Sequence, residues 1–153
     1  MKKRIYLILC ISFILLISGC GKKTEVSNPF VEVSNIKEVE SLVGFTITVP
    51  DKVLDYKDKR ISVIENEMID ITYTKKKSKL TIRKGIGTVD ISGDYNNYSD
   101  IKENTIDGVT VTTRGNDNLI FNATWNNDNY TYAIVSNKGI DSGDIVNLVK
   151  EIK

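Results

Sequence analysis

Apolar and polar residues alternate along several short segments between residues 45 and 136. In segment 68–74, for example, Ile69, Ile71 and Tyr73 fall on one face. A period of two over five to seven residues predicts a β-strand with one buried face. Segments with this pattern or with many β-branched residues predict strands at 45–49, 60–64, 68–74, 80–84, 104–106, 109–114, 119–125 and 130–136.

Segment 119–125 places its large apolar residues on a single face. Leu119, Phe121, Ala123 and Trp125 alternate there with polar partners. The alternation favours a core position for Trp125 over a role in surface recognition. Tyr130 and Tyr132 in the next strand are weighed in the same way, as surface candidates with a core alternative.

The segments between the strands carry turn signals. Asp107-Gly108 separates 104–106 from 109–114, and a two-residue Asp-Gly connection is a strong β-hairpin signal. The polar segments 65–67, 75–79 and 126–129 also predict turns.

Two amphipathic helices flank the strands. Asn35 can cap a helix at 36–43, with Glu38 in a capping-box position and Gly44 after the end. Asp141 can cap a second helix. The apolar stripe of that second helix consists of Ile145, Leu148, Val149 and Ile152.

These elements predict an α+β fold. The sheet is expected to be antiparallel, with about six to seven strands, and a short N-terminal helix and a C-terminal helix pack on one face. The other face carries many Thr, Asn, Lys and Asp residues, so it is expected to be solvated or to bind a ligand.

Segment 84–100 fits neither a regular strand nor a simple turn. Its sequence, KGIGTVDISGDYNNYSD, combines glycines, acidic residues and tyrosines among asparagines. One interpretation is a strand with a bend followed by an exposed connection. The other is a contact site for a ligand or protein, because tyrosines and amides suit recognition surfaces. The candidate contact residues are Asp90, Asp94, Tyr95 and Tyr98.

Two more specific hypotheses for this segment, a calcium site and a phosphate-binding loop, have little support. Asp90, Ser92, Asp94 and Asn96 have the spacing of the first calcium ligands in an EF-hand, but Tyr95 stands where that loop needs glycine. The KGIG sequence lacks the frame of a phosphate-binding loop. We therefore predict neither a metal site nor a cofactor.

Composition excludes several kinds of chemistry. The 153 residues contain no histidine and two cysteines, Cys10 and Cys20. A Ser/His/Asp triad, a Cys/His dyad and a histidine-ligated zinc site are therefore excluded. Without residues 1–19 the side-chain charge would be −2, since three of the 21 basic residues and none of the 20 acidic residues lie there. Nothing in this balance indicates a nucleic-acid partner.

The first twenty residues have the layout of a secretory signal. Basic residues at 2–4 precede an apolar stretch at 5–17, and Ser18 and Gly19 lead to Cys20. The ending LISGC resembles the lipobox of bacterial lipoproteins, which implies diacylglyceryl transfer to the Cys20 sulfur and cleavage before that residue. An uncleaved anchor is the less favoured alternative because a spanning helix needs roughly 17–25 apolar residues. An ordinary secretory signal is the other alternative.

This interpretation divides the chain into three parts. Residues 1–19 are the expected signal peptide, 20–33 the lipidated cysteine and a tether, and 34–153 a single α+β extracytoplasmic domain. The expected location is the outer face of the cell membrane, where the diacylglyceryl-cysteine holds the chain.

Residues 28–152 resemble an uncharacterised extracytoplasmic domain family of low-GC Gram-positive bacteria. The most distinctive part is RKGIGTVDISGDYNNY at 83–98. Members occur as lipoproteins and at the outer end of membrane-anchored proteins of the anti-sigma type. The resemblance implies a small α+β domain and brings no catalytic residues.

These observations favour a non-catalytic binding or sensing domain that meets a protein or a cell-envelope ligand. One alternative is a carrier of lipid or another hydrophobic ligand. The other is a small wall-directed hydrolase that uses aspartate carboxylates across a cleft.

The Cys20→Ala variant is expected to lose the lipid site. Most of the protein should then leave the membrane fraction and should no longer be processed at residue 20, because two acyl chains supply the stable hold. Cell fractionation and intact-mass measurement check this. Cys10→Ala is the matched control, since Cys10 should leave with the signal. Unchanged processing and membrane association of Cys20→Ala would contradict the predicted anchor.

Overall fold

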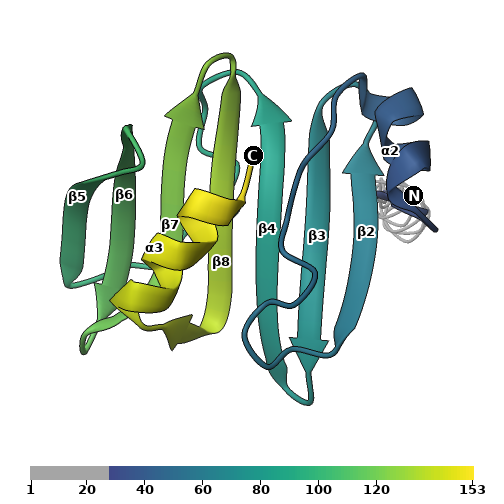
Figure 1. The fold of residues 1–153 in the computed structure, drawn as a ribbon. Helices are drawn as coiled ribbons and strands as arrows, with labels where there is room; N and C mark the ends of the chain where they lie inside the picture. The colour runs from purple at the N-terminus through teal and green to yellow at the C-terminus, as the bar shows by residue number, and fades with distance from the viewer. Residues whose placement is uncertain (1–27) are drawn as a thin grey trace, which may run out of the picture.

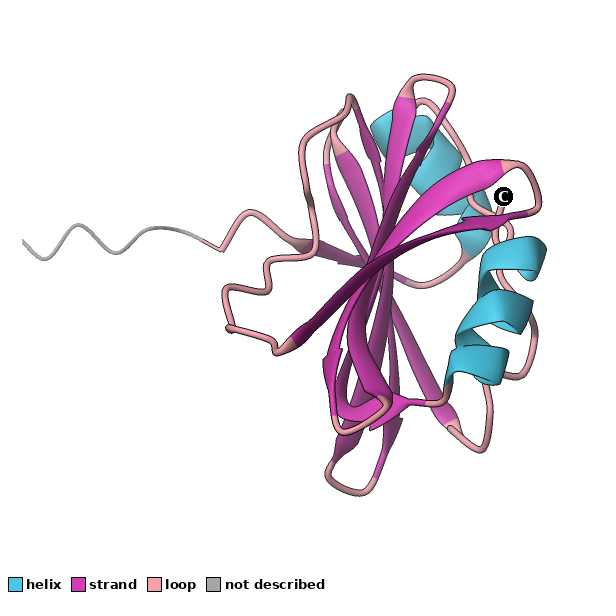
Figure 2. Ribbon diagram, turned by 90° about the vertical axis from the view of Figure 1, so that its left-hand side faces the viewer, coloured by secondary structure: helices cyan, strands magenta, loops and turns pink. Residues whose placement is uncertain are grey.

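The computed structural model describes residues 28–153, and these form one eight-stranded antiparallel sheet with two helices on the same face (Figures 1 and 2). The predicted α+β class is confirmed, with slightly more strands than the six to seven expected. The predicted signal peptide and Cys20 lie outside the described residues. The elements are β1 Val31–Val33, α2 Ile36–Val43, β2 Asp58–Ile64, β3 Met68–Lys75, β4 Ser78–Ile86, β5 Asp100–Ile106, β6 Val109–Asn116, β7 Leu119–Asn127, β8 Tyr130–Ile140 and α3 Ser142–Glu151.

The sheet consists of two meanders, β1 to β4 and β5 to β8. The last strand of each meander, β4 or β8, lies in the middle of the sheet. The strand order is β1-β2-β3-β4-β8-β7-β6-β5, and β4 pairs antiparallel with β8. The connection at 87–99 therefore links a central strand to the far edge strand. It passes over the face that carries no helix (Figure 2).

Helix α2 begins and ends as its sequence predicts. The Asn35 side-chain oxygen accepts hydrogen bonds from the Lys37 and Glu38 N–H groups, both at 3.1 Å. Gly44 follows the helix in the left-handed conformation, with φ at 79°. Asp141 occupies the N-cap position of α3, but its side chain makes no capping hydrogen bond there.

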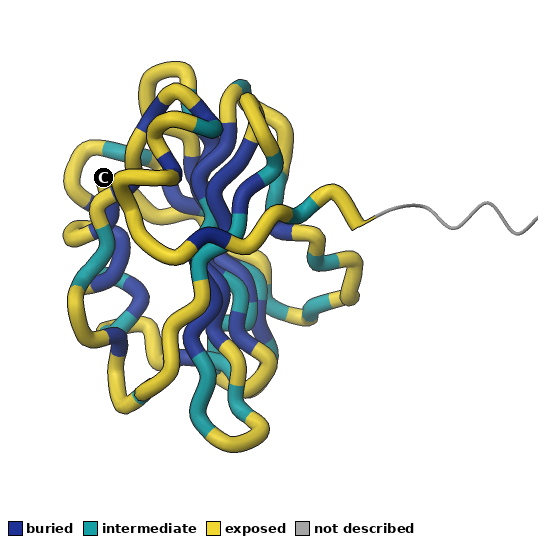
Figure 3. The backbone as a smooth tube through the Cα atoms, turned by 90° about the vertical axis from the view of Figure 1, so that its right-hand side faces the viewer, coloured by how far each residue is buried: buried dark blue, intermediate teal, exposed yellow. Residues whose placement is uncertain are grey.

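The hydrophobic core lies between the sheet and the two helices. In Figure 3 the buried backbone follows the central strands and the inner sides of the helices, while the turns are exposed. Trp125 is 5% exposed and stacks on Tyr132, with 5.2 Å between the ring centroids. The predicted core position of Trp125 is confirmed. The largest fully buried apolar side chains are Ile69, Ile71, Leu80, Ile82, Ile134 and Ile145.

Two segments near the N-terminus differ from the expectation. Residues 45–49 do not form a strand, although Phe45 and Ile47 are buried as their alternation predicts. This segment packs on the sheet instead of joining it, and its Thr48 pairs with Lys153 through two backbone hydrogen bonds. Residues 31–33, expected at the end of the tether, form β1 and pair with β2.

A β-bulge in β7 overturns the expected placement of Phe121. The register with both neighbouring strands shifts near residues 120–122, so an extra residue reverses the alternation. Ala123 and Trp125 remain on the helix face, while Phe121 stacks on Tyr98 on the opposite face. Ile120 takes the helix face and packs against the core in its place.

Gly115, opposite this bulge in β6, is expected to tolerate no side chain. A Cβ at residue 115 would lie 2.0 Å from the Leu119 carbonyl oxygen, so the backbone would have to move. We expect Gly115→Ala to lower the free energy of unfolding by about 1–3 kcal/mol, measured by urea denaturation. Gly143→Ala in α3 is the control, because nothing lies within 4 Å of its Cβ. The control should be neutral or slightly stabilising, and equal stability of the two variants would argue against a tight bulge.

Candidate functional site

The helix-free face of the sheet carries a cleft, which we call the polar cleft. Its volume is about 590 Å³, and the 87–99 connection forms one wall while β4 and β8 form the floor. The lining residues come from β4, the connection, β6, β7 and β8: Lys79, Thr81, Arg83, Ser92, Gly93, Asp94, Asn96, Asn97, Tyr98, Asn116, Phe121, Val135, Ser136 and Asn137.

Arg83 fixes the position of the connection. Its Nε donates to Asp70 Oδ2 at 2.8 Å. Its Nη1 donates to the carbonyl oxygens of Ile91 and Ser92 at 3.0 and 2.7 Å. Asp70 is 6% exposed, and its second oxygen accepts a hydrogen bond from the Thr72 hydroxyl. One guanidinium therefore joins strands β3 and β4 to the wall of the cleft.

Asp94 organises the other half of the wall. Its Oδ2 accepts from the Tyr98 hydroxyl at 2.6 Å and from Asn122 Nδ2 at 3.3 Å, and its Oδ1 accepts from the backbone and side-chain nitrogens of Asn96. Burial acts to raise the pKa of this carboxyl, but the hydrogen bonds outweigh it and leave the pKa below its usual value. Asp94 is therefore held as a carboxylate.

Asn122 lies buried below this network. It is 1% exposed, and its Nδ2 reaches Asp94. Its Oδ1 has no hydrogen-bond partner within residues 28–153. A buried amide oxygen without a protein partner carries a desolvation cost unless a water or ligand pairs with it.

The four predicted contact residues do not form one site in the structure. Asp94 and Tyr98 line the polar cleft. The Tyr98 ring stacks on Phe121, with 5.8 Å between centroids and 26° between planes. Tyr95 is 96% exposed and does not line the cleft. Asp90 lies beside a smaller hollow of about 120 Å³, where its Oδ2 is 3.5 Å from Arg114 Nη1.

The calcium-like spacing has a structural use instead. Asp90 Oδ1 accepts from the Ser92 N–H at 2.8 Å, and Asp94 Oδ1 accepts from the Asn96 N–H at 3.1 Å. These are turns closed by aspartate side chains, in which one oxygen of each carboxylate bonds the local backbone. Among the described residues no three acidic, histidine or cysteine side chains gather as a metal site.

The polar cleft continues into a second hollow over β2 and β3. That hollow has a volume of about 190 Å³ and shares Lys79 and Arg83 with the first. Arg60 and Glu32 stand at its exposed side. The two hollows therefore lie side by side on the helix-free face, with Lys79 and Arg83 between them.

Sequence reasoning missed Arg83, Asn116, Asn137 and Phe121. Arg83 carried a usable signal, because it alternates with Leu80 and Ile82 and so had to face away from the helices. Asn116 and Asn137 carried no such signal in the sequence, because only the strand order brings them to the polar cleft. Phe121 was assigned to the wrong face because a bulge leaves no clear mark in the apolar pattern.

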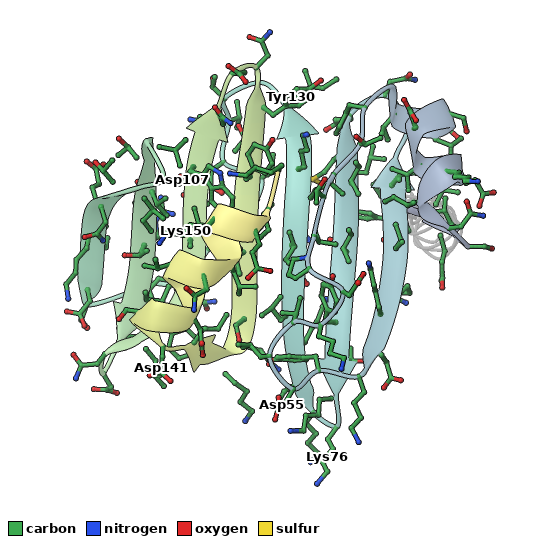
Figure 4. The ribbon with its side chains drawn as sticks, in the orientation of Figure 1. Asp55, Lys76, Asp107, Tyr130, Asp141 and Lys150 are labelled. Carbon is green, nitrogen blue, oxygen red and sulfur yellow. The ribbon has the colours of Figure 1, made fainter. Side chains whose placement is uncertain are left out.

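Two further features lie on the helix face. Lys84 is 8% exposed, donates from Nζ to the Thr46 carbonyl at 2.8 Å and lies over the rings of Phe45, Tyr130 and Tyr132. Burial lowers the pKa of Lys84. Tyr130 marks this cluster in Figure 4. These contacts of Lys84 hold the segment after α2 against the sheet.

The second feature is a hollow of about 530 Å³ between α3 and strands β5 to β7. Ile106, Ile120 and Ile145 give it an apolar base, and Asp107 and Lys150 stand at its edge (Figure 4).

No family model matches the chain, and no curated protein or solved structure does either. The resemblance to the extracytoplasmic domain family therefore stays a prediction. None of the helices in the described part of the chain is long and apolar enough to span a membrane.

Arg83→Met is expected to disorder the wall of the polar cleft. The variant leaves the buried Asp70 carboxylate without its cation, which should lower the free energy of unfolding by about 3 kcal/mol. Hydrogen exchange should also rise between residues 87 and 99. Urea denaturation and exchange mass spectrometry measure the two effects. Lys79→Met, on the same strand and face but exposed, should change neither; equal protection of the connection in both variants would refute the role of Arg83.

Proposed function

We propose that this chain is a membrane-anchored extracytoplasmic lipoprotein whose domain binds or senses a ligand without catalysis. The lipid on Cys20 would hold the domain at the outer membrane face, and the polar cleft would receive a cell-envelope or protein ligand. The cleft is the observation that carries the binding role, because it is recessed, polar and built on a rigid sheet.

The hydrogen bonds that fix the wall of the cleft support a role in recognition. Arg83 and the hydrogen bonds of Asp94 fix its wall before any ligand arrives. A preorganised site spends less of its binding energy on ordering itself. The aromatic and amide side chains on that wall are residue types common at recognition surfaces.

The chemistry of the carboxylates favours binding over hydrolysis. A glycosidase needs two carboxyl groups across its cleft, one of them with a raised pKa to act as the acid. Asp94 is the one acidic side chain that lines the polar cleft, and its pKa is lowered. Asp90 lies outside the cleft beside Arg114.

The hydrophobic-carrier alternative has one supporting observation, which is the hollow beside α3. Its apolar base could take part of a lipid chain. Native mass spectrometry of the purified protein would favour this alternative if a lipid were retained. Six of the ten residues that line the hollow are polar or charged, among them Asn104, Thr113 and Ser142, so the polar cleft remains the preferred site.

Photocrosslinking in cells tests the proposed binding role. We expect p-benzoylphenylalanine at position 97, on the cleft wall, to give a specific crosslinked product in the cell envelope. The same group at position 127 is the matched control, because Asn127 is also exposed but lies outside the cleft. Products of equal yield at both positions, or no product at position 97, would reject the cleft as the binding site.

A further inference from the structure

Two of the three charged side chains that line the polar cleft, Arg83 and Asp94, already have hydrogen-bond partners within the protein. Arg83 is shared between Asp70 and two carbonyl oxygens, and Asp94 accepts four hydrogen bonds. Lys79 is the remaining charged side chain on the lining, and it is exposed at the edge. A ligand in the cleft would therefore meet a nearly neutral surface, which disfavours a strongly charged partner.

Neutral amides supply the hydrogen-bonding groups that remain. Asn116 uses its Oδ1 to accept from the backbone and hydroxyl of Ser99, which leaves its Nδ2 for a ligand. Asn97 is exposed on the lining and makes no side-chain hydrogen bond to another described residue. Each amide group offers both donors and an acceptor, and a sugar hydroxyl also donates and accepts. Asn97 can therefore donate to and accept from a hydroxyl, and Asn116 can donate to one.

An aromatic surface lies beside these amides. Tyr98 and Phe121 stack on each other, and both line the cleft. The bond from the Tyr98 hydroxyl to Asp94 fixes the ring. The C–H face of a pyranose ring packs well on such a surface because it is apolar and flat, whereas the hydroxyls at its edge need polar partners.

The position of the cleft argues against a peptide ligand. Its floor is β4 and β8, which are interior strands whose backbone groups pair with their neighbours. A peptide that adds a strand needs a free sheet edge, and one that inserts side chains needs apolar pockets. The cleft offers no free strand edge, and the apolar side chains on its lining are Phe121 and Val135, beside the Tyr98 ring, which do not form a row of separate pockets.

We propose that the polar cleft binds a neutral oligosaccharide, with Tyr98 and Phe121 as the stacking surface and Asn97 and Asn116 as hydrogen-bonding groups. This inference rests on the proposed binding function and adds the ligand class. A volume of about 590 Å³ is within the usual range for small-molecule sites.

Isothermal titration of the full chain in detergent micelles tests the inference. The probes are the neutral tetrasaccharides chitotetraose, cellotetraose and maltotetraose, the cationic de-N-acetylated form of chitotetraose, and tetra-alanine. At least one neutral tetrasaccharide should bind saturably, with an affinity that changes little as NaCl is raised. The cationic tetrasaccharide and tetra-alanine should bind more weakly.

Matched variants locate the binding. Tyr98→Ala should weaken binding about tenfold through the lost aromatic contact, and Tyr95→Ala, on the same connection but outside the cleft, should not. Asn97→Ala should weaken binding severalfold, while Asn127→Ala should not. The Asn97 variant keeps the test valid if Tyr98→Ala alters the connection, because Asn97 holds no other described residue.

The outcomes separate this inference from the proposed function. Binding of tetra-alanine alone, or no binding of any neutral tetrasaccharide while the crosslink at position 97 persists, overturns the ligand class and leaves the function standing. Sugar binding that survives both Tyr98→Ala and Asn97→Ala overturns the site. Loss of the position-97 crosslink together with absent sugar binding overturns both.

Discussion

The guanidinium of Arg83 lies between the buried carboxylate of Asp70 and two carbonyl oxygens of the connection between β4 and β5. That connection must cross half of the sheet, because β4 is central and β5 is at the far edge. Without a partner inside the sheet it would be a long exposed loop. Arg83 supplies several charge-assisted hydrogen bonds at once, and these turn the crossing into the wall of a cleft.

The bulge in β7 supplies the aromatic part of that cleft. Because of the bulge, Phe121 lies on the helix-free face and stacks on Tyr98, while Ile120 packs against the core. Two glycines make this geometry accessible. Gly115 lets the Leu119 carbonyl come close, and Gly139, with φ at 73°, leaves room for the Phe121 ring. The packing of the sheet and the form of the recess therefore depend on the same irregularity.

The recess combines rigidity with unused hydrogen-bonding capacity. In the polar cleft Arg83 is paired with Asp70 and Asp94 accepts hydrogen bonds from its neighbours, so selectivity would come largely from amides and rings. Asn122 lies buried below the wall, and its Oδ1 has no hydrogen-bond partner among the described residues. Such a site suits the binding role proposed above.

The sequence by itself determined the helices, most strands and the one-sided core, because these follow from local periodicity and capping. Asn35 and Gly44 delimit α2 where they were expected to do so, while the Glu38 carboxylate accepts from the Ser34 N–H and not from Asn35 as a capping box requires. It also indicated the segment that holds Asp94 and Tyr98. Only the tertiary structure decided that β4 pairs with β8, that Phe121 faces the cleft, and that Arg83, Asn116 and Asn137 meet there. Long-range pairing and a bulge depend on packing between distant segments, and a local pattern carries no record of that packing.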